Sequence, residues 1–268
     1  MKKQALLLFL AFLLGTSGVM HALTDSEYAE IFGENWSGAE AYLQENRAVW
    51  DSIFAHFDVD PLLAESIVFP ELVRYSFFRD RIEKATMRRL YAHGGSEKGN
   101  FSIGVFQMKA TFAEGLEKLW MESELPKKYG LTFDLSDDKF NRKRRLERLC
   151  STEQQCVYLA MFLHVVPRQY PELKEMDDTT RVRFLATAYN YSFTAPAEKV
   201  MRESTIPRYH TDFVAHETTV YYSYADMALA RYLRVRPAPS PRPGGGSPGG
   251  GDSPLKSSRS FRSLRSVG

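Results

Sequence analysis

The strongest constraint on the fold is a segment near residue 70 that is apolar on almost every side of a helix. It runs from Leu62 to about Arg79, and its apolar residues are Leu62, Leu63, Ile67, Val68, Phe69, Leu72 and Val73. A helix that is apolar all round packs at the centre of a domain. Asp60 and Pro61 indicate its start, because Asp is a favoured N-cap and Pro suits the first helical position.

Apolar residues recur at helical spacing through most of the remaining body, and no segment shows the alternation of a strand. A first helix is predicted from about Gly38 to Phe57, with a core face made of Ala41, Leu43, Val49, Ile53, Phe54 and Phe57. Further helices are predicted at Arg81–Ala92, Phe106–Met121, Thr152–Tyr170, Thr179–Tyr191 and Glu217–Leu233. The predicted fold class is mainly α, with one helical domain over residues 23–235.

The N-terminus has the pattern of a secretory signal peptide, predicted over residues 1–22. A short basic start, Met1-Lys2-Lys3, precedes an apolar stretch and then small residues, and cleavage is expected after Ala22, with Gly18 as the alternative. An uncleaved membrane anchor is the other interpretation, although the apolar run is short for a span. No cysteine lies near this point, so we expect no lipid anchor and predict an exported, periplasmic protein.

Residues 236–268 are predicted to be a disordered tail, because Pro, Gly and Ser cannot bury enough apolar surface to fold. The tail carries six basic residues against Asp252 alone, a net charge of +5. It is expected to act as a flexible tether, with binding to an anionic polymer of the cell envelope as the alternative. Loss of Lys2 and Lys3 brings the formal charge from +2 to zero, which gives no case for a nucleic-acid partner.

The two cysteines leave two alternatives open. In one continuous helix Cys150 and Cys156 would lie about 9 Å apart along the axis, too far for a disulfide. Thr152 and Gln155 resemble a capping box, which would begin a new helix and let the chain fold back. A disulfide and two unpaired, buried thiols are therefore both open.

Glu71 is the strongest candidate for a catalytic residue. It follows Pro70, which must kink or restart the helix, and its carboxyl lies in an apolar segment. Burial would raise its pKa and keep it protonated near neutral pH, as a general acid requires, whereas a helix restarting at Pro70 would lower that pKa. Pairing with Arg74 is the plain structural alternative. Glu65 is a rival that lies about 240° around the helix from Glu71, so both cannot face one cleft.

Two further segments carry polar residues suited to a ligand. A glycine-rich loop delivers Ser102, Gly104 and Gln107 before a predicted helix, and Gln can hydrogen-bond sugar hydroxyl and amide groups. Tyr189 and Asn190 lie late in another predicted helix. Taken singly, these segments are typical of an ordinary loop and an ordinary helix end.

In this order the three pieces resemble the lytic transglycosylases of the lysozyme-like superfamily. The family has a catalytic Glu on a buried helix, then Gly-x-x-Gln, then Ala-Tyr-Asn, and these match Glu71, Gly104 to Gln107 and Ala188 to Asn190. The strings around Glu71 and Gln107 are similar to a Bacteroidetes-type branch of exported proteins. Two departures stand out, since 36 positions separate Glu71 from Gln107 and Tyr191-Ser192 follow Asn190.

The resemblance implies a lysozyme-like domain that cleaves the β-1,4 bond between N-acetylmuramic acid and N-acetylglucosamine in peptidoglycan. Glu71 would act alone as acid and base and leave 1,6-anhydro ends. Tyr189 would hold Glu71, while Ser102, Gln107 and Asn190 would contact the glycan strand.

Three other functions are open. A lysozyme-type hydrolase would need a second carboxylate, for which Asp80, Glu83 and Glu97 are candidates. A non-catalytic envelope scaffold would bind glycan without cutting it, and an unrelated helical domain would hold Glu71, Gln107 and Tyr189 far apart. We expect no cofactor and no metal, because no histidine has a partner at metal-binding spacing; the histidines considered are His56, His93, His164, His210 and His216.

Overall fold

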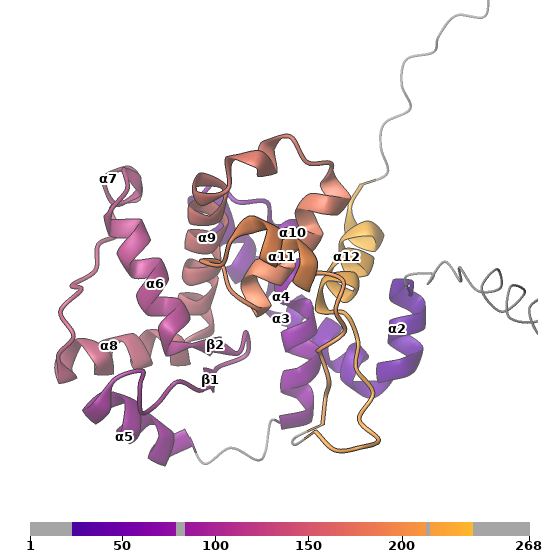
Figure 1. Ribbon diagram of the computed structural model, residues 1–268, viewed down its shortest axis with the longest axis horizontal. Helices are drawn as coiled ribbons and strands as arrows, with labels where there is room; N and C mark the ends of the chain where they lie inside the picture. The colour runs from indigo at the N-terminus through magenta and orange to yellow at the C-terminus, as the bar shows by residue number, and fades with distance from the viewer. Residues whose placement is uncertain (1–22, 79–83, 213–214, 238–268) are drawn as a thin grey trace, which may run out of the picture. The chain divides into compact units, whose positions relative to one another are not determined.

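The computed structural model describes residues 23–78, 84–212 and 215–237; for residues 76–78 and 84–88 it describes the backbone alone. The described chain up to Arg236 belongs to one compact unit, which is mainly helical and contains one short hairpin (Figure 1). The mainly α prediction is confirmed. The predicted signal peptide and nearly all of the predicted tail lie outside the described residues.

The predicted central helix is present as α4 (Pro61–Phe78). It begins as expected, because the Leu62 backbone N–H donates to Asp60 Oδ1 at 2.9 Å. Its middle is fully enclosed, as Ile67, Val68 and Phe69 have no exposed surface. The helices around α4 are α3 (Glu34–His56), α9 (Thr152–Gln169), α10 (Asp178–Asn190) and α12 (Tyr224–Val235) (Figure 1).

The first helical segment is longer than predicted and consists of two helices. A capping box formed by Thr24 and Glu27 begins α2 (Asp25–Phe32), and Gly33, with a φ of 52°, separates it from α3. Two predicted core positions are wrong, since Ala41 and Val49 are exposed. The buried side chains on this face of α3 are Trp36, Ala39, Leu43, Trp50 and Phe54, which keep a regular helical spacing.

The region that carries the glycine-rich loop differs from the prediction. After α5 (Lys84–Gly94), the chain forms a two-stranded antiparallel hairpin, β1 (Ser102–Ile103) and β2 (Met108–Lys109). The next helix, α6 (Ala110–Met121), therefore begins four residues later than the predicted Phe106. Strands of two residues are too short to show alternation, so the sequence pattern did not reveal them.

Several short helices were not predicted, namely α7 (Leu125–Tyr129), α8 (Lys139–Cys150), η1 (Pro171–Lys174) and α11 (Ala197–Glu203). The last predicted helix also begins too early, because α12 starts at Tyr224. Its N-cap is Ser223, whose side chain accepts from the Asp226 N–H. The residues just before α12 lie antiparallel to an earlier segment, because Tyr222 pairs with Tyr209 in an isolated β-bridge.

The break between α8 and α9 lies where expected, but its cap differs from the predicted one. Ser151, and not Thr152, caps α9 by accepting from the Gln154 N–H. Both cysteines are free, with Cys150 exposed and Cys156 buried. The structure thus contains neither the disulfide nor the pair of buried thiols.

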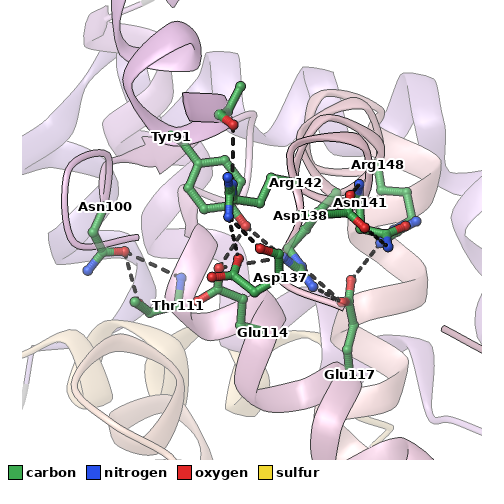
Figure 2. Close-up of polar contacts among 12 residues, drawn as sticks. Tyr91, Asn100, Thr111, Glu114, Glu117, Asp137, Asp138, Asn141, Arg142 and Arg148 are labelled. Atoms are coloured by element: carbon green, nitrogen blue, oxygen red, sulfur yellow. Dashed lines mark hydrogen bonds and ion pairs between the residues drawn. The ribbon is translucent and has the colours of Figure 1, made fainter. Parts of the chain in front are cut away.

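A buried ion cluster joins α6 and α8 and is contacted by a residue of α9; Figure 2 shows Glu117 and Arg148 of this cluster. Glu117 of α6 is completely enclosed and lies 2.6 Å from Arg145 Nη2 and 2.8 Å from Arg148 Nη2, both on α8. The Tyr158 hydroxyl of α9 donates to the same carboxylate. Because every charge in the cluster has a partner, it fixes how these helices pack around the hairpin.

Candidate active site

Glu71 lies in the middle of α4, at the edge of a cavity of about 460 Å³. Its side chain is buried, with a residue exposure of 4%. Asn190 Nδ2 lies 3.3 Å from Glu71 Oε1, and Arg74 Nη1 lies 3.4 Å from Oε2. The carboxyl group is therefore oriented by two side chains while it borders an open space.

Pro70 does not restart the helix, because α4 continues through it to Phe78. Two tyrosine hydroxyls from the C-terminal part of the chain supply donors to α4 here. Tyr209 donates to the Pro70 carbonyl at 2.7 Å, and Tyr224 donates to the Ile67 carbonyl at 2.9 Å. Glu71 is thus not in a first helical turn, and the expected lowering of its pKa by a helix N-terminus does not arise.

The pKa of Glu71 is raised above its ordinary value because burial removes the carboxylate from water. Arg74, the hydrogen bond from Asn190 and the charge of Lys109 oppose this rise without reversing it. The shift therefore favours the protonated acid relative to an exposed glutamate, while positive charge stands close by to stabilise the carboxylate once the proton has left.

The pairing with Arg74 is present, but Arg74 is also held by other groups. Its Nε donates to the His210 carbonyl at 3.2 Å, and its guanidinium lies 4.5 Å from the centre of the Tyr209 ring. These contacts fix the guanidinium independently of Glu71. Arg74 therefore acts as a fixed positive charge on the cavity wall.

The hairpin beside Glu71 is clamped from behind by Gln155 of α9. The Gln155 amide accepts from the Phe106 N–H at 2.9 Å and donates to the Ile103 and Leu149 carbonyls at 2.8 and 2.7 Å. Gly104 has a φ of 69°, and a Cβ there would lie 1.9 Å from Gln155 Nε2. Only glycine satisfies both the backbone conformation and this close approach.

Gln107 lies at the turn of the same hairpin with a φ of 50°, an uncommon conformation for a non-glycine residue. Its Nε2 donates to the Gly104 carbonyl at 2.7 Å, which holds the side chain in place. Gln107 and Ser102 both line the cavity. The hairpin therefore brings two of the predicted ligand-binding residues to the same space as Glu71.

Tyr189 and Asn190 also line the cavity, but their contacts differ from those expected. The Tyr189 hydroxyl donates to the Phe106 carbonyl at 2.7 Å, so it holds the hairpin and not Glu71. Asn190, expected to contact substrate, is the residue that donates to Glu71. The contact with Glu71 predicted for Tyr189 is thus made by Asn190, because adjacent residues on a helix point about 100° apart.

All five predicted site residues thus border one cavity. The sequence reasoning missed other lining residues, among which Phe112 and Phe193 form an edge-to-face pair with ring centres 5.2 Å apart. Aromatic walls of this kind pack against the apolar faces of ligands. The sequence contained no signal for them beyond ordinary apolar spacing, and the full set of missed residues is Arg74, Met108, Lys109, Thr111, Phe112, Gly115, Tyr191, Ser192, Phe193 and Thr194.

Glu65, the rival acid, does not line this cavity. It is buried with an exposure of 3%, and its Oε2 lies 3.2 Å from Arg47 Nη2 of α3. Among the described residues that line the cavity, Glu71 is the sole carboxylic acid. Glu97 does not line it either, and Asp80 and Glu83 lie outside the described residues.

Within the described ranges, no three His, Cys, Asp or Glu side chains gather as a metal site would require. In the same ranges, none of the helices has the length and apolar character needed to cross a membrane. Comparison with protein-family models, with curated proteins and with solved structures found no match to this chain.

Proposed function

We propose that the protein is an exported lytic transglycosylase that cleaves the β-1,4 bond between N-acetylmuramic acid and N-acetylglucosamine in peptidoglycan. The observation that carries the proposal is Glu71, a buried carboxyl group with a raised pKa on an open cavity with polar and aromatic walls. A general acid at neutral pH needs these properties. We further propose that the helical unit is lysozyme-like, with α4 as its central helix.

The reaction needs one carboxyl group in two steps. Protonated Glu71 gives its proton to the glycosidic oxygen as the C1–O4 bond breaks, and the muramic sugar gains oxocarbenium character at C1. The Glu71 carboxylate then removes the proton from the C6 hydroxyl of the same sugar as O6 bonds to C1. The product is a 1,6-anhydro ring, no water is consumed, and Glu71 ends protonated as it began.

The neighbours of Glu71 suit both halves of this cycle. Burial favours the acid before proton transfer, and the charges of Arg74 and Lys109 stabilise the carboxylate formed by it. Asn190 holds one carboxyl oxygen, so the group keeps its orientation when it changes from acid to base. Ser102 and Gln107 lie on the hairpin side of the cavity, where they would hydrogen-bond the glycan.

The lining of the cavity favours a transglycosylase over a lysozyme-type hydrolase. Hydrolysis normally uses a second carboxylate to activate water or form a covalent intermediate. Glu71 is the sole acid among the described lining residues, so no second carboxylate among them can activate water or form a covalent intermediate, and the C6 hydroxyl of the substrate serves as the nucleophile. The proposal also requires export, for which the signal-peptide pattern of residues 1–22 is the support.

The test is mass spectrometry of fragments released from purified peptidoglycan by the protein lacking residues 1–22. Glu71→Gln should release nothing, and Glu65→Gln is the matched control because it changes a second buried carboxyl on the same helix. Anhydro-muramic ends made by the wild type and Glu65→Gln alone would support the proposal. Reducing ends would indicate a lysozyme, and no release by any protein would favour a glycan-binding scaffold.

A further inference from the structure

A second cavity, of about 260 Å³, borders the first one. Its wall combines residues from β2, α10, α11, α12 and the segment after α11. The two cavities share Lys109, Asn190 and Tyr191 as lining residues. Asn190 is also the residue that donates to Glu71, so both cavities lie next to a side chain that contacts the proposed catalytic group.

The second cavity has an excess of positive charge. Its ionisable acids and bases are Lys109, Arg208 and Glu203, and Arg208 Nη2 lies 2.9 Å from Glu203 Oε2. Lys109 is exposed and forms no ion pair with any residue in the described part of the chain. One positive charge therefore remains for an anionic ligand.

Other polar groups on this wall already have partners within the protein. The Tyr209 and Tyr224 hydroxyls donate to carbonyls of α4, and the Thr187 hydroxyl donates to the Arg183 carbonyl. The Glu203 side chain is 8% exposed, so its carboxylate is an acceptor held at the cavity wall. The wall thus offers Lys109 and the Arg208–Glu203 ion pair, whose remaining guanidinium N–H groups and second carboxylate oxygen suit a ligand with both carboxylates and N–H groups.

The size and position of the cavity restrict the ligand further. At roughly 30 Å³ for each water-sized group, the space holds about nine such groups. A lactyl group alone has five heavy atoms and would leave much of this space unfilled. Because both cavities are lined by Asn190, which contacts Glu71, a substituent of the sugar closest to Glu71 is the part of a glycan nearest to the second cavity.

We propose that the second cavity binds the peptide stem of the muramic sugar whose bond is cleaved, with Lys109 and Arg208 holding a stem carboxylate and Glu203 accepting a stem N–H. This inference rests on the proposed function, since it assumes that a glycan strand occupies the first cavity. It makes the enzyme selective for glycan that still carries its peptides.

The test measures binding by the non-cleaving Glu71→Gln protein, so that affinity is read without turnover. The ligands are glycan oligomers with peptide stems, the same oligomers stripped by an amidase, and chitin oligomers of equal length. Lys109→Gln and Arg208→Gln are each added to the Glu71→Gln protein. Lys127→Gln is the matched control, because Lys127 is an exposed lysine of α7 that does not line this cavity.

Each cavity substitution should weaken binding of the stem-bearing oligomers by about tenfold, the usual effect of losing one charged contact. Stripped oligomers should lose less, and chitin binding should not change with Arg208→Gln, because Arg208 does not line the first cavity. An equal or larger loss with stripped oligomers would refute the stem proposal in favour of the lactyl carboxylate. Unchanged binding of all three ligands would refute any role for the cavity.

Failure of this inference can be told apart from failure of the proposed function. If the wild type produces anhydro-muramic ends equally well from stem-bearing and stripped glycan, the stem proposal is wrong while the transglycosylase proposal stands. If it produces none from either glycan, the proposed function itself is wrong.

Discussion

Glu65→Gln is expected to remove a pH dependence of stability that is built into the centre of the fold. Glu65 is buried, and its Oε1 accepts no hydrogen bond from the described residues. Burial and the nearby charge of Asp51 raise its pKa from 4.5 to about 7, although Arg47 opposes the rise. Glutamine has the same shape as the protonated acid but cannot ionise.

The sign and size of the effect follow from these values. The folded protein holds the Glu65 proton more tightly than the unfolded chain, so the wild type is most stable below pH 4.5 and loses stability as the pH rises through 7. The rise in the pKa of Glu65 from 4.5 to about 7 corresponds to a loss of about 3 kcal/mol in the free energy of unfolding, at ~1.4 kcal/mol for each pKa unit. Glu65→Gln should lack this loss.

The assay is urea unfolding of both proteins at several pH values between 4 and 8, with the free energy of unfolding compared at each one. The contributions of the other titrating groups to the free energy of unfolding are common to both proteins, so they cancel in the difference. The difference should be small at acidic pH and grow by about 3 kcal/mol in favour of Glu65→Gln at pH 8. A difference that stays constant across this range would refute the reasoning.

Three further predictions concern stability and reactivity. Gly104→Ala should lower the free energy of unfolding by about 3 kcal/mol or more, because the new Cβ would collide with the Gln155 amide that clamps the hairpin. Gly38→Ala lies on an open helix face and should raise the free energy of unfolding by about 1 kcal/mol in the same urea assay. A thiol reagent should label Cys150 at once and Cys156 only on unfolding, since burial also raises the pKa of the second thiol. Glu117→Gln should destabilise the protein by about 3 kcal/mol or more, measured by urea unfolding, because Arg148 loses its partner charge and Arg145 is left with its longer, 3.5 Å pair with Glu114.

The sequence alone predicts those features that depend on local pattern. The central helix, its start at Pro61 and the burial of Glu71 follow from apolar residues on all sides and an Asp-Pro cap. The order of the three motifs also led us to predict that Gln107 and Tyr189 lie near Glu71, and all three residues line one cavity. These features depend on neighbours a few positions apart, or on the order of short motifs along the chain.

The features that sequence did not predict depend on contacts between distant segments. Whether Tyr189 or Asn190 contacts Glu71 is decided by how α10 is rotated against α4, which periodicity does not specify. Gln155 looked like part of a helix cap, yet its amide holds a hairpin 49 to 52 positions earlier in the chain. Lys109 had no distinctive sequence context, and only the fold places it between two cavities.

The two tyrosines that donate to α4 also set the order in which the protein can mature. Tyr209 and Tyr224 lie 139 and 157 positions after their acceptors, so α4 cannot gain these contacts until nearly the whole helical unit has been synthesised. Closing such long loops is slow compared with forming local helices. The surroundings of Glu71 are therefore among the last to be completed, and a chain still leaving the ribosome lacks the contacts that hold this part of α4.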